Sequence, residues 1–460
     1  MSRCAFLSHP QEQGSGDYLH RVHLPARALS RYWPVEELQT SQPDFVRRAV
    51  ACELLVVNMV ADPVIERIFA ARRELGRHSV FEINDDFQHF PRSLPGHAFY
   101  ALPRTQRLIA GLASSASLLQ FSSHGLQQAY GHLNPRQAVL VNHLGELPAL
   151  PAAAPREAAD VVLGWAGSAG HADDAAELAS LLSHWAQRRQ ARGWALPRLR
   201  LMAAPHVASA FDACGLQVDV RPTADFAQYL QFLGGLDVGF ACIASEPFAL
   251  GRSDGKYIEL ASRGAVCIAS DRGEYRHGIL HGETGFLFAD QAQFDLALDL
   301  VVDDAGTRLK VRAAAHEHLA RHRLHDGAAR HRARVYAPLM GLDEVPPPGE
   351  HRLLPSGEGR LPHERLLEQR MLAAALRHRE GRHDIALDLY VECMQDAPDF
   401  YLPWERASAI ARAIGPDKEA AFLARLAERK LLAAIEAGAC RNSPYKPDGD
   451  APTQVVEWGR

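Results

Sequence analysis

The fold of this chain is decided by residues 245–264, which read SEPFALGRSDGKYIELASRG. An apolar run, LDVGFACI at 236–243, precedes this stretch, and a second one, GAVCIAS at 264–270, follows it. Short apolar runs bounded in this way are typical of buried β-strands. The order strand, loop, helix, strand predicts one unit of an α/β sheet.

The helix of this unit is predicted to begin with Ser253 as its N-cap and to end at Gly264. Free N–H groups and the positive end of the helix dipole at its start, together with Arg252, suit a phosphate. Lys256 lies one turn further on, and Glu259 follows it by three residues on the same face. This arrangement can hold a diphosphate and a ribose. The alternative is an exposed ion pair between Lys256 and Glu259 on a surface helix, which stabilises little.

The sequence around this helix resembles the donor-site block of GT-B glycosyltransferases of the large retaining family 4. The similar segments are residues 256–264, VCIASDRGEYR at 266–276 and HGETGFLF at 281–288. The resemblance implies that Glu259 binds the nucleotide ribose and that Arg252 and Lys256 hold the diphosphate. The other donor-binding residues that we expect are Gly167, Ser168, Ser253, Asp254 and Gly255.

One position departs from the pattern of this family. Its members usually carry two glutamates seven residues apart, and Gly251 stands where the first of them is expected. Glu246, in the preceding loop, either supplies the missing carboxylate or is an ordinary loop residue, and the sequence leaves both interpretations open. We therefore name Glu246 as one of three candidate catalytic residues.

The other two candidates are Asp85 and Asp86, which follow the predicted strand at 79–83. Ligand sites of parallel α/β sheets lie at the carboxyl ends of strands. Adjacent carboxylates could hold a divalent ion beside a diphosphate. The resemblance instead implies no metal, and we favour a metal-free role on the acceptor side, with an N-cap of the next segment as the structural alternative.

The first half of the chain opens with a predicted strand at 4–8 and a glycine loop, and a helix is expected at 24–29. In the GT-B glycosyltransferases that this sequence resembles, such a loop brings backbone amides toward the donor or acceptor. The expected acceptor-side residues are Gly14, Gly16, Tyr18, His20 and Arg21. The alternative is that this glycine-rich segment is simply a loop.

A second half repeats the pattern after a Pro- and Ala-rich linker at 147–155. A predicted strand at 161–168 ends in the Gly167-Ser168 loop and leads into a predicted helix at 173–189. We therefore expect an α/β protein of the GT-B class, with two Rossmann-like domains facing across a cleft. Residues 1–150 form the acceptor-side domain, residues 156–338 form the donor domain, and a helical segment at 316–336 crosses back to the first domain.

The character of the sequence changes after a Pro-rich linker at 339–362. Gly381, Ala386, Tyr390 and Pro398 fall at the offsets of a tetratricopeptide repeat. We expect a TPR-like helical extension at 363–440 and a disordered tail at 441–460. The extension either docks a partner protein or a second copy of the chain, or caps the domain.

The composition limits the classes of partner. The 460 residues are 47% hydrophobic and 23% charged, with a formal charge of -5, which argues against nucleic acid as the main partner. The seven scattered cysteines suit a reducing compartment. We see neither a signal peptide nor an apolar run of membrane-spanning length, and we expect a cytoplasmic protein with at most peripheral contact to the inner membrane.

The leading hypothesis is an enzyme that transfers a sugar from a nucleotide-diphosphate donor to a bacterial lipopolysaccharide, O-antigen or related surface glycan, or to its lipid-linked precursor. The resemblance points to a GDP-linked sugar such as mannose or rhamnose, to retention of configuration, and to no cofactor. The competing hypothesis is a scaffold or sugar-nucleotide-binding protein with a degenerate transferase domain, acting through its helical tail. Gly251 is its best support.

Overall fold

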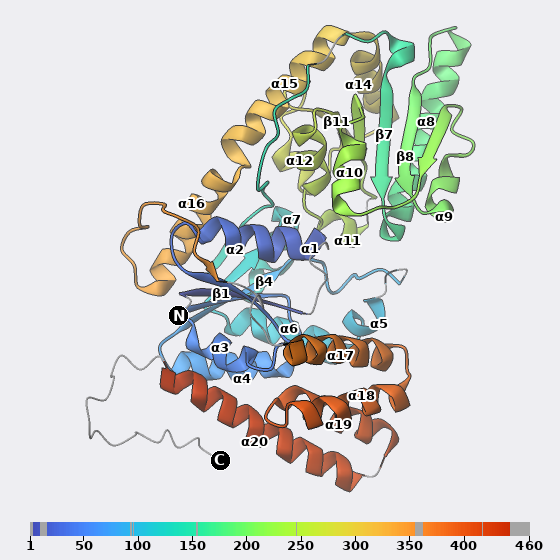
Figure 1. Cartoon of the computed structure of the whole chain (residues 1–460). Helices are drawn as coiled ribbons and strands as arrows, with labels where there is room; N and C mark the ends of the chain where they lie inside the picture. Colours follow the sequence, from blue (N-terminus) through green and yellow to red (C-terminus); the bar gives the residue numbers. More distant parts are fainter. Residues whose placement is uncertain are drawn as a thin grey trace.

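The computed structural model contains two parallel sheets, each covered by helices, and a helical C-terminal region (Figure 1). It describes residues 3–9, 16–92, 94, 96–152, 155–244, 246–354, 362–415 and 417–441. Figure 1 shows the second domain at the top, the first domain below it, and the C-terminal helices beneath the first domain. The α/β class predicted from the sequence is confirmed.

The first sheet has seven strands in the order β13-β2-β1-β3-β4-β5-β6. Its core strand β1 pairs in parallel with both β2 and β3, so that Cys4 lies opposite Val35 and Leu54. The strands are β1 (Cys4–Ser8), β2 (Val35–Gln39), β3 (Leu54–Asn58), β4 (His78–Ile83), β5 (Leu118–Phe121), β6 (Gln137–Val139) and β13 (Leu353–Leu354). The helices of this domain are α1 (Gly16–Tyr18), a π-helix (Leu19–His23), α2 (Leu24–Leu29), α3 (Phe45–Ala51), α4 (Pro63–Glu74), α5 (His97–Tyr100), α6 (Pro103–Ser115) and α7 (His124–Tyr130).

The second sheet has six strands in the order β12-β11-β10-β7-β8-β9, and all of its pairings are parallel. The strands are β7 (Val162–Gly167), β8 (Arg198–Ala203), β9 (Gln217–Arg221), β10 (Val238–Ala241), β11 (Val266–Ser270) and β12 (Phe286–Phe288). The helices are α8 (Ala172–Ala191), α9 (Pro205–Ala208), α10 (Phe226–Leu233), α11 (Pro247–Leu250), α12 (Gly255–Ser262), α13 (Tyr275–Gly278), α14 (Gln291–Asp303), α15 (Ala305–His322) and α16 (His325–Tyr336).

The sequence pattern missed strand β2. Its residues read VEELQ, and two adjacent glutamates argue against a buried strand. In the structure Glu36 and Glu37 are both buried, because each has a partner. Glu36 accepts hydrogen bonds from Arg48, and Glu37 accepts one from Tyr18. Pairing across elements therefore stabilises a strand that alternation alone does not predict.

Helices α15 and α16 carry the chain from the second domain back to the first, as predicted, along one side of the molecule (Figure 1). Ala329 and Tyr336 of α16 lie in a buried cluster with Cys4 and Phe6 of β1. The expected linker at 339–362 is partly structured, because β13 joins the edge of the first sheet beside β2. The two domains are thus tied by packed helices as well as by the chain at 147–155.

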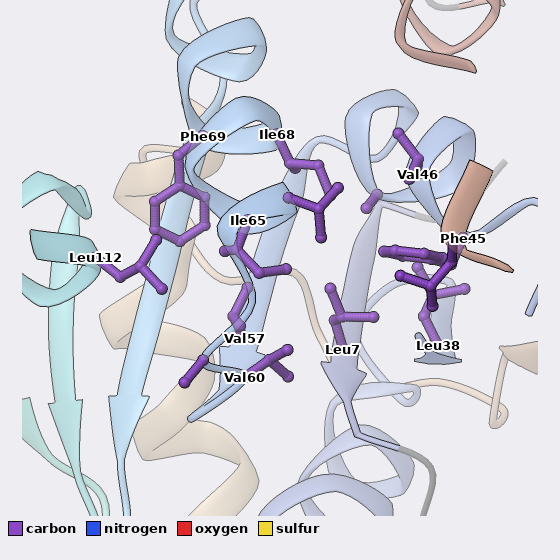
Figure 2. Packing of buried hydrophobic residues seen from close by; sticks show 14 of the residues in the cluster. Leu7, Leu38, Phe45, Val46, Val57, Val60, Ile65, Ile68, Phe69 and Leu112 are labelled. Atoms are coloured by element: carbon purple, nitrogen blue, oxygen red, sulfur yellow. The ribbon is translucent and has the colours of Figure 1, made fainter. Parts of the chain in front are cut away.

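The C-terminal region consists of four helices: α17 (Pro362–Arg379), α18 (His383–Asp396), α19 (Tyr401–Ile414) and α20 (Asp417–Arg441). Neighbouring helices pack in sequence order, and α20 also packs against α3 of the first domain. The C-terminal helices share a hydrophobic core with the first domain. Figure 2 shows the part of this core that belongs to the first domain, with Phe45 and Val46 of α3 above Leu7 and Leu38. Buried residues of all four C-terminal helices belong to this cluster.

These helices therefore cap the first domain, which was one of the two roles left open by the sequence. Gly381 forms the turn between α17 and α18 with a φ of +76°, and Ala386 is fully buried. A tetratricopeptide repeat and a docked partner remain predictions. The predicted disordered tail lies outside the described residues, apart from Arg441 at the end of α20.

The central helix begins slightly later than predicted. Helix α12 starts at Gly255, and Asp254, in place of Ser253, occupies the N-cap position. The prediction that Ser253 caps the helix is wrong, because its hydroxyl oxygen accepts a hydrogen bond from Asn142 of the first domain at 3.0 Å. The predicted end is close to the observed one: Gly264 has a φ of +84°, a conformation that favours glycine.

Candidate functional site

The site lies where the loops after β7 and β10 meet. Arg252, which precedes α12, donates a hydrogen bond from Nη1 to Asp174 Oδ2 at 2.9 Å. Its Nη2 donates to the carbonyl oxygen of Gly170 at 2.8 Å. The same Nη1 lies 2.7 Å from Nδ1 of His171, and the guanidinium stacks over the ring of Phe248. Arg252 is thus fixed at the carboxyl ends of two adjacent strands, where ligands of parallel sheets bind.

Lys256 joins the same cluster. Its Nζ lies 3.4 Å from His171 Nδ1 and 4.9 Å from the centre of the Trp165 ring, a cation–π distance. Burial lowers the pKa of Lys256 to about 8; nearby Asp174 opposes that shift and Arg252 adds to it. Two cations therefore stand together close to one partly buried point.

His171 and Asp174 complete the cluster, and the sequence analysis missed both. His171 precedes α8, and Asp174 lies in its first turn, with 2.6 Å between His171 Nδ1 and Asp174 Oδ2. Burial, with Lys256 and Arg252 nearby, lowers the pKa of His171 to about 3, so the ring is neutral. Burial alone would raise the pKa of Asp174, but His171 and the two cations lower it. The signal that could have revealed the pair is its three-residue spacing directly after the Gly-Ser loop.

Glu259 points toward the first domain. Its Oε1 lies 3.1 Å from Nε2 of His20, and its Oε2 accepts a hydrogen bond from the Tyr229 hydroxyl at 2.8 Å. Only 8% of Glu259 is exposed. The alternative of an exposed ion pair with Lys256 on a surface helix is therefore wrong. His20, predicted on the acceptor side, is thus one of the first-domain residues that contact the donor-side helix and the loop before it.

Asp254 has a different role from the one expected. It is fully buried and forms an ion pair with Arg323, whose Nη1 also donates to the carbonyl oxygen of Asn142 at 2.9 Å. We correct the donor-binding assignment of Asp254: the residue joins α12 to the α15–α16 connection. Gly255 starts the helix beside it, with the Asn142 side chain 3.6 Å from where a Cβ would lie.

The loop that contains Gly251 is pressed against the first domain. Ser123 donates a hydrogen bond to the carbonyl oxygen of Gly251 at 2.7 Å. A Cβ at position 251 would lie 3.0 Å from Leu126 and 3.5 Å from Asp86. A glutamate at this position would need its neighbours to shift, which gives a physical reason for glycine here. Glu246 is exposed at the start of α11, and its side chain caps no backbone group there.

The two candidate aspartates after β4 have different surroundings. Asp86 accepts hydrogen bonds from the backbone N–H groups of Gln88 and His89 and from the Tyr130 hydroxyl, so it orders its own loop. It is not a helix N-cap, because the next helix, α5, begins at His97. Asp85 has no such set of bonds. Burial and the nearby Asp17 raise the pKa of Asp85 to about 7, although Arg252 opposes the shift. Of this pair, Asp85 is the carboxyl group suited to proton transfer near neutral pH.

The predicted acceptor-side residues of the first domain lie in different surroundings. Tyr18 is buried and its hydroxyl donates to Glu37, so it does not line the space between the domains. Arg21 is buried too, with Nε 2.5 Å from Glu82 Oε1 and Nη1 donating to Asn142 at 2.8 Å. Both are core residues, and we correct their assignment. Gly16 opens α1, and Gly14 lies outside the described residues.

The glycine loop of the second domain lies beside the cations. A Cβ at Gly167 would lie 2.4 Å from the Trp165 ring, the ring on which Lys256 rests, so only glycine fits. Ser168 follows at the surface, before the short helix that ends at His171. Within the described ranges no group of three or more His, Cys, Asp and Glu side chains could hold a metal ion. No helix among the described residues is long and apolar enough to cross a bilayer.

Solved structures similar to this one are glycosyltransferases. HepE from Anabaena, in complex with UDP and glucose, superposes with a TM-score of 0.52 over 74% of this chain and 100% of HepE, at 14% identity. Sucrose-phosphate synthase from Thermosynechococcus elongatus gives 0.52 over 74% and 99%, at 11% identity. The lipopolysaccharide outer core galactosyltransferase WaaB gives 0.50 over 73% and 99%, at 13% identity.

This chain has the GT-B fold. The low identities mean that the likeness establishes the fold alone. No family model matches the sequence, and no curated protein does. The GT-B architecture that the donor-site block predicted is therefore confirmed, while membership of family 4 stays a prediction.

Proposed function

We propose that this protein is a glycosyltransferase that moves a sugar from a nucleoside-diphosphate donor to a bacterial surface glycan. The observation that carries the proposal is that Arg252 and Lys256 lie in one cluster at the carboxyl ends of β7 and β10, inside a GT-B fold. Two cations close together suit a diphosphate, and they stabilise the negative charge that develops on it as the sugar leaves. Glu259, one turn from Lys256 on α12, is suited to the ribose hydroxyls.

The finer parts of the proposal rest on sequence resemblance. We propose a family 4-like hexosyltransferase that retains configuration and needs no metal, with lipopolysaccharide, O-antigen or a lipid-linked precursor as acceptor. A GDP-linked mannose or rhamnose is the donor suggested by the sequence, whereas the similar HepE was solved with UDP and glucose. Both nucleotides therefore belong in the first binding experiment.

Purified protein is tested by thermal shift and calorimetry with UDP and GDP. We expect one of them to stabilise the wild type, and Lys256→Ala and Glu259→Ala to abolish the stabilisation. The matched controls are Lys310→Ala and Glu317→Ala, two exposed positions of α15 outside the donor-site block, which should bind like the wild type. A wild type that responds to neither nucleotide would overturn the proposal. The protein is then incubated with a panel of sugars linked to the nucleotide that binds. Release of free nucleoside diphosphate from one of them identifies the donor.

A second candidate is a sugar-nucleotide-binding scaffold without transferase activity. Gly251 favours it, because the packing against Leu126 leaves no ready space for the glutamate that family 4 enzymes carry there. The C-terminal helices pack on the first domain, and in this candidate function they would provide the interaction surface. Binding of a nucleotide sugar without nucleotide release, in the presence of extracted surface glycans, would favour this candidate over the enzyme.

A further inference from the structure

Asp174 connects the two loops that form the cation cluster. Its Oδ1 accepts a hydrogen bond from the backbone N–H of Ala244, which follows β10, at 2.9 Å. Its Oδ2 accepts one from Arg252 Nη1 at 2.9 Å and lies 2.6 Å from Nδ1 of His171. Only 3% of the residue is exposed. Every polar contact of this carboxylate therefore fixes a part of the cluster in place.

His171 lies between Asp174 and the two cations. Its Nδ1 faces the Asp174 carboxylate, Arg252 at 2.7 Å and Lys256 at 3.4 Å. One ring nitrogen of a neutral imidazole either donates or accepts, and a hydrogen bond donated to a carboxylate is the stronger choice. The ring is then oriented by Asp174, and its Nδ1 accepts no hydrogen bond from either cation.

The charge of Lys256 depends on its surroundings. The charged and titratable groups that face it are Asp174, Arg252, Glu259, His171 and Cys242. Arg252 and burial disfavour the ammonium, while Asp174 is the strongest of the groups that favour it. His171 is neutral, and the Cys242 thiol is protonated because burial raises its pKa. Removing the charge of Asp174 would therefore make Lys256 lose its proton more easily.

We propose that Asp174 is the positioning residue of the diphosphate site: it holds the Arg252 guanidinium in place and keeps Lys256 cationic. It acts through these two residues, not by touching the donor. The inference rests on the proposed function, because it takes a diphosphate as the ligand of the two cations. A donor anion then meets two preorganised positive groups and causes little rearrangement.

The first test needs no ligand. The chain has five lysines, so protein labelled with ¹³C at lysine Cε gives few NMR signals, and Lys256→Arg assigns the one of interest. We expect Lys256 to titrate near pH 8 in the wild type and at clearly lower pH in Asp174→Asn. Asp173→Asn, the exposed neighbour, is the matched control and should leave the titration unchanged. An unchanged titration in Asp174→Asn would overturn the inference. If that variant does not fold, Asp174→Glu, which keeps the charge, must keep the wild-type titration.

The second test measures binding of UDP and GDP by calorimetry from about pH 6 to about pH 9. Near pH 6 Lys256 is cationic in both proteins, so a loss of affinity in Asp174→Asn at this pH reports the looser Arg252 guanidinium alone. Near pH 8 we expect the loss of affinity in Asp174→Asn to be larger than near pH 6, by about fivefold if the pKa of Lys256 falls by about one unit. A loss that is the same at every pH would contradict the claim that Asp174 keeps Lys256 cationic. A wild type that binds neither nucleotide refutes the proposed function, while the NMR titration still decides the role of Asp174.

Discussion

Replacing Arg323 by methionine should destabilise the protein strongly, because it leaves Asp254 buried without its partner. Nη2 of Arg323 pairs with Asp254, and Nη1 donates to the carbonyl oxygen of Asn142 at 2.9 Å. Asp254 is fully buried, and Arg323 is 7% exposed. Breaking a buried ion pair from one side typically costs about 3–5 kcal/mol. We expect a loss of this size in the free energy of unfolding at neutral pH, measured by urea denaturation.

The loss should also depend on pH. Burial raises the pKa of Asp254, although Arg323 opposes this. A carboxyl group whose pKa is higher in the folded than in the unfolded protein stabilises the fold at low pH, and this contribution disappears as the pH rises through the folded-state pKa. Without Arg323 the pKa of Asp254 rises further. The destabilisation of Arg323→Met should therefore be largest near pH 7 and smaller near pH 5.

Arg321→Met is the matched control, two residues away. Arg321 pairs with Glu317 on the surface, and both side chains are more than 60% exposed. Such a pair contributes about 0.5 kcal/mol or less. Equal losses for the two variants, or a loss for Arg323→Met that grows on acidification, would refute this account of the connection between α12 and α16.

Three further predictions concern the contacts around the site. Gly125→Ala should lower the melting temperature, because its Cβ would lie 2.3 Å from a backbone oxygen of the second domain; Gly111→Ala in α6, which has room, should not. Gly438→Ala should loosen α20, since its Cβ would lie 2.6 Å from a backbone oxygen of α3, and limited proteolysis should then release the C-terminal helices faster than from wild type. Nucleotide binding should weaken as the pH rises through about 8, because Lys256 then becomes neutral; calorimetry that shows constant affinity up to pH 9.5 would contradict this.

The sequence was informative wherever one element determines its own structure. Strand β1 was predicted with its observed bounds, because it is a continuous apolar run in the centre of a sheet. The end of α12 near Gly264 was predicted for the same local reason. The GT-B architecture followed from two similar strand-and-loop openings and one ordered block of residues.

The remaining errors come from contacts between distant parts of the chain. Glu36 and Glu37 are buried in β2 because Arg48 and Tyr18 meet them there, which no periodicity reveals. Arg21 was expected to face the ligand because it follows a glycine loop, but it pairs with Glu82, 61 residues later. The same cause explains Asp254, whose partner lies beyond α15.

His171 and Asp174 show a third kind of limit. A histidine and an aspartate three residues apart at the start of a helix are common, and a capping role is their ordinary interpretation. Their importance appears only when β10 brings Ala244 and Arg252 to the same place. Sequence reasoning found the cations of the site, and the fold supplied the groups that hold them.

The most direct test of the central claim is a crystal structure of the protein with the nucleoside diphosphate that it binds. We predict that the diphosphate oxygens lie within hydrogen-bond distance of Arg252 and Lys256, and that the ribose hydroxyls contact Glu259. A nucleotide bound elsewhere, with the cation cluster of the second domain left as it is in the free protein, would contradict the account.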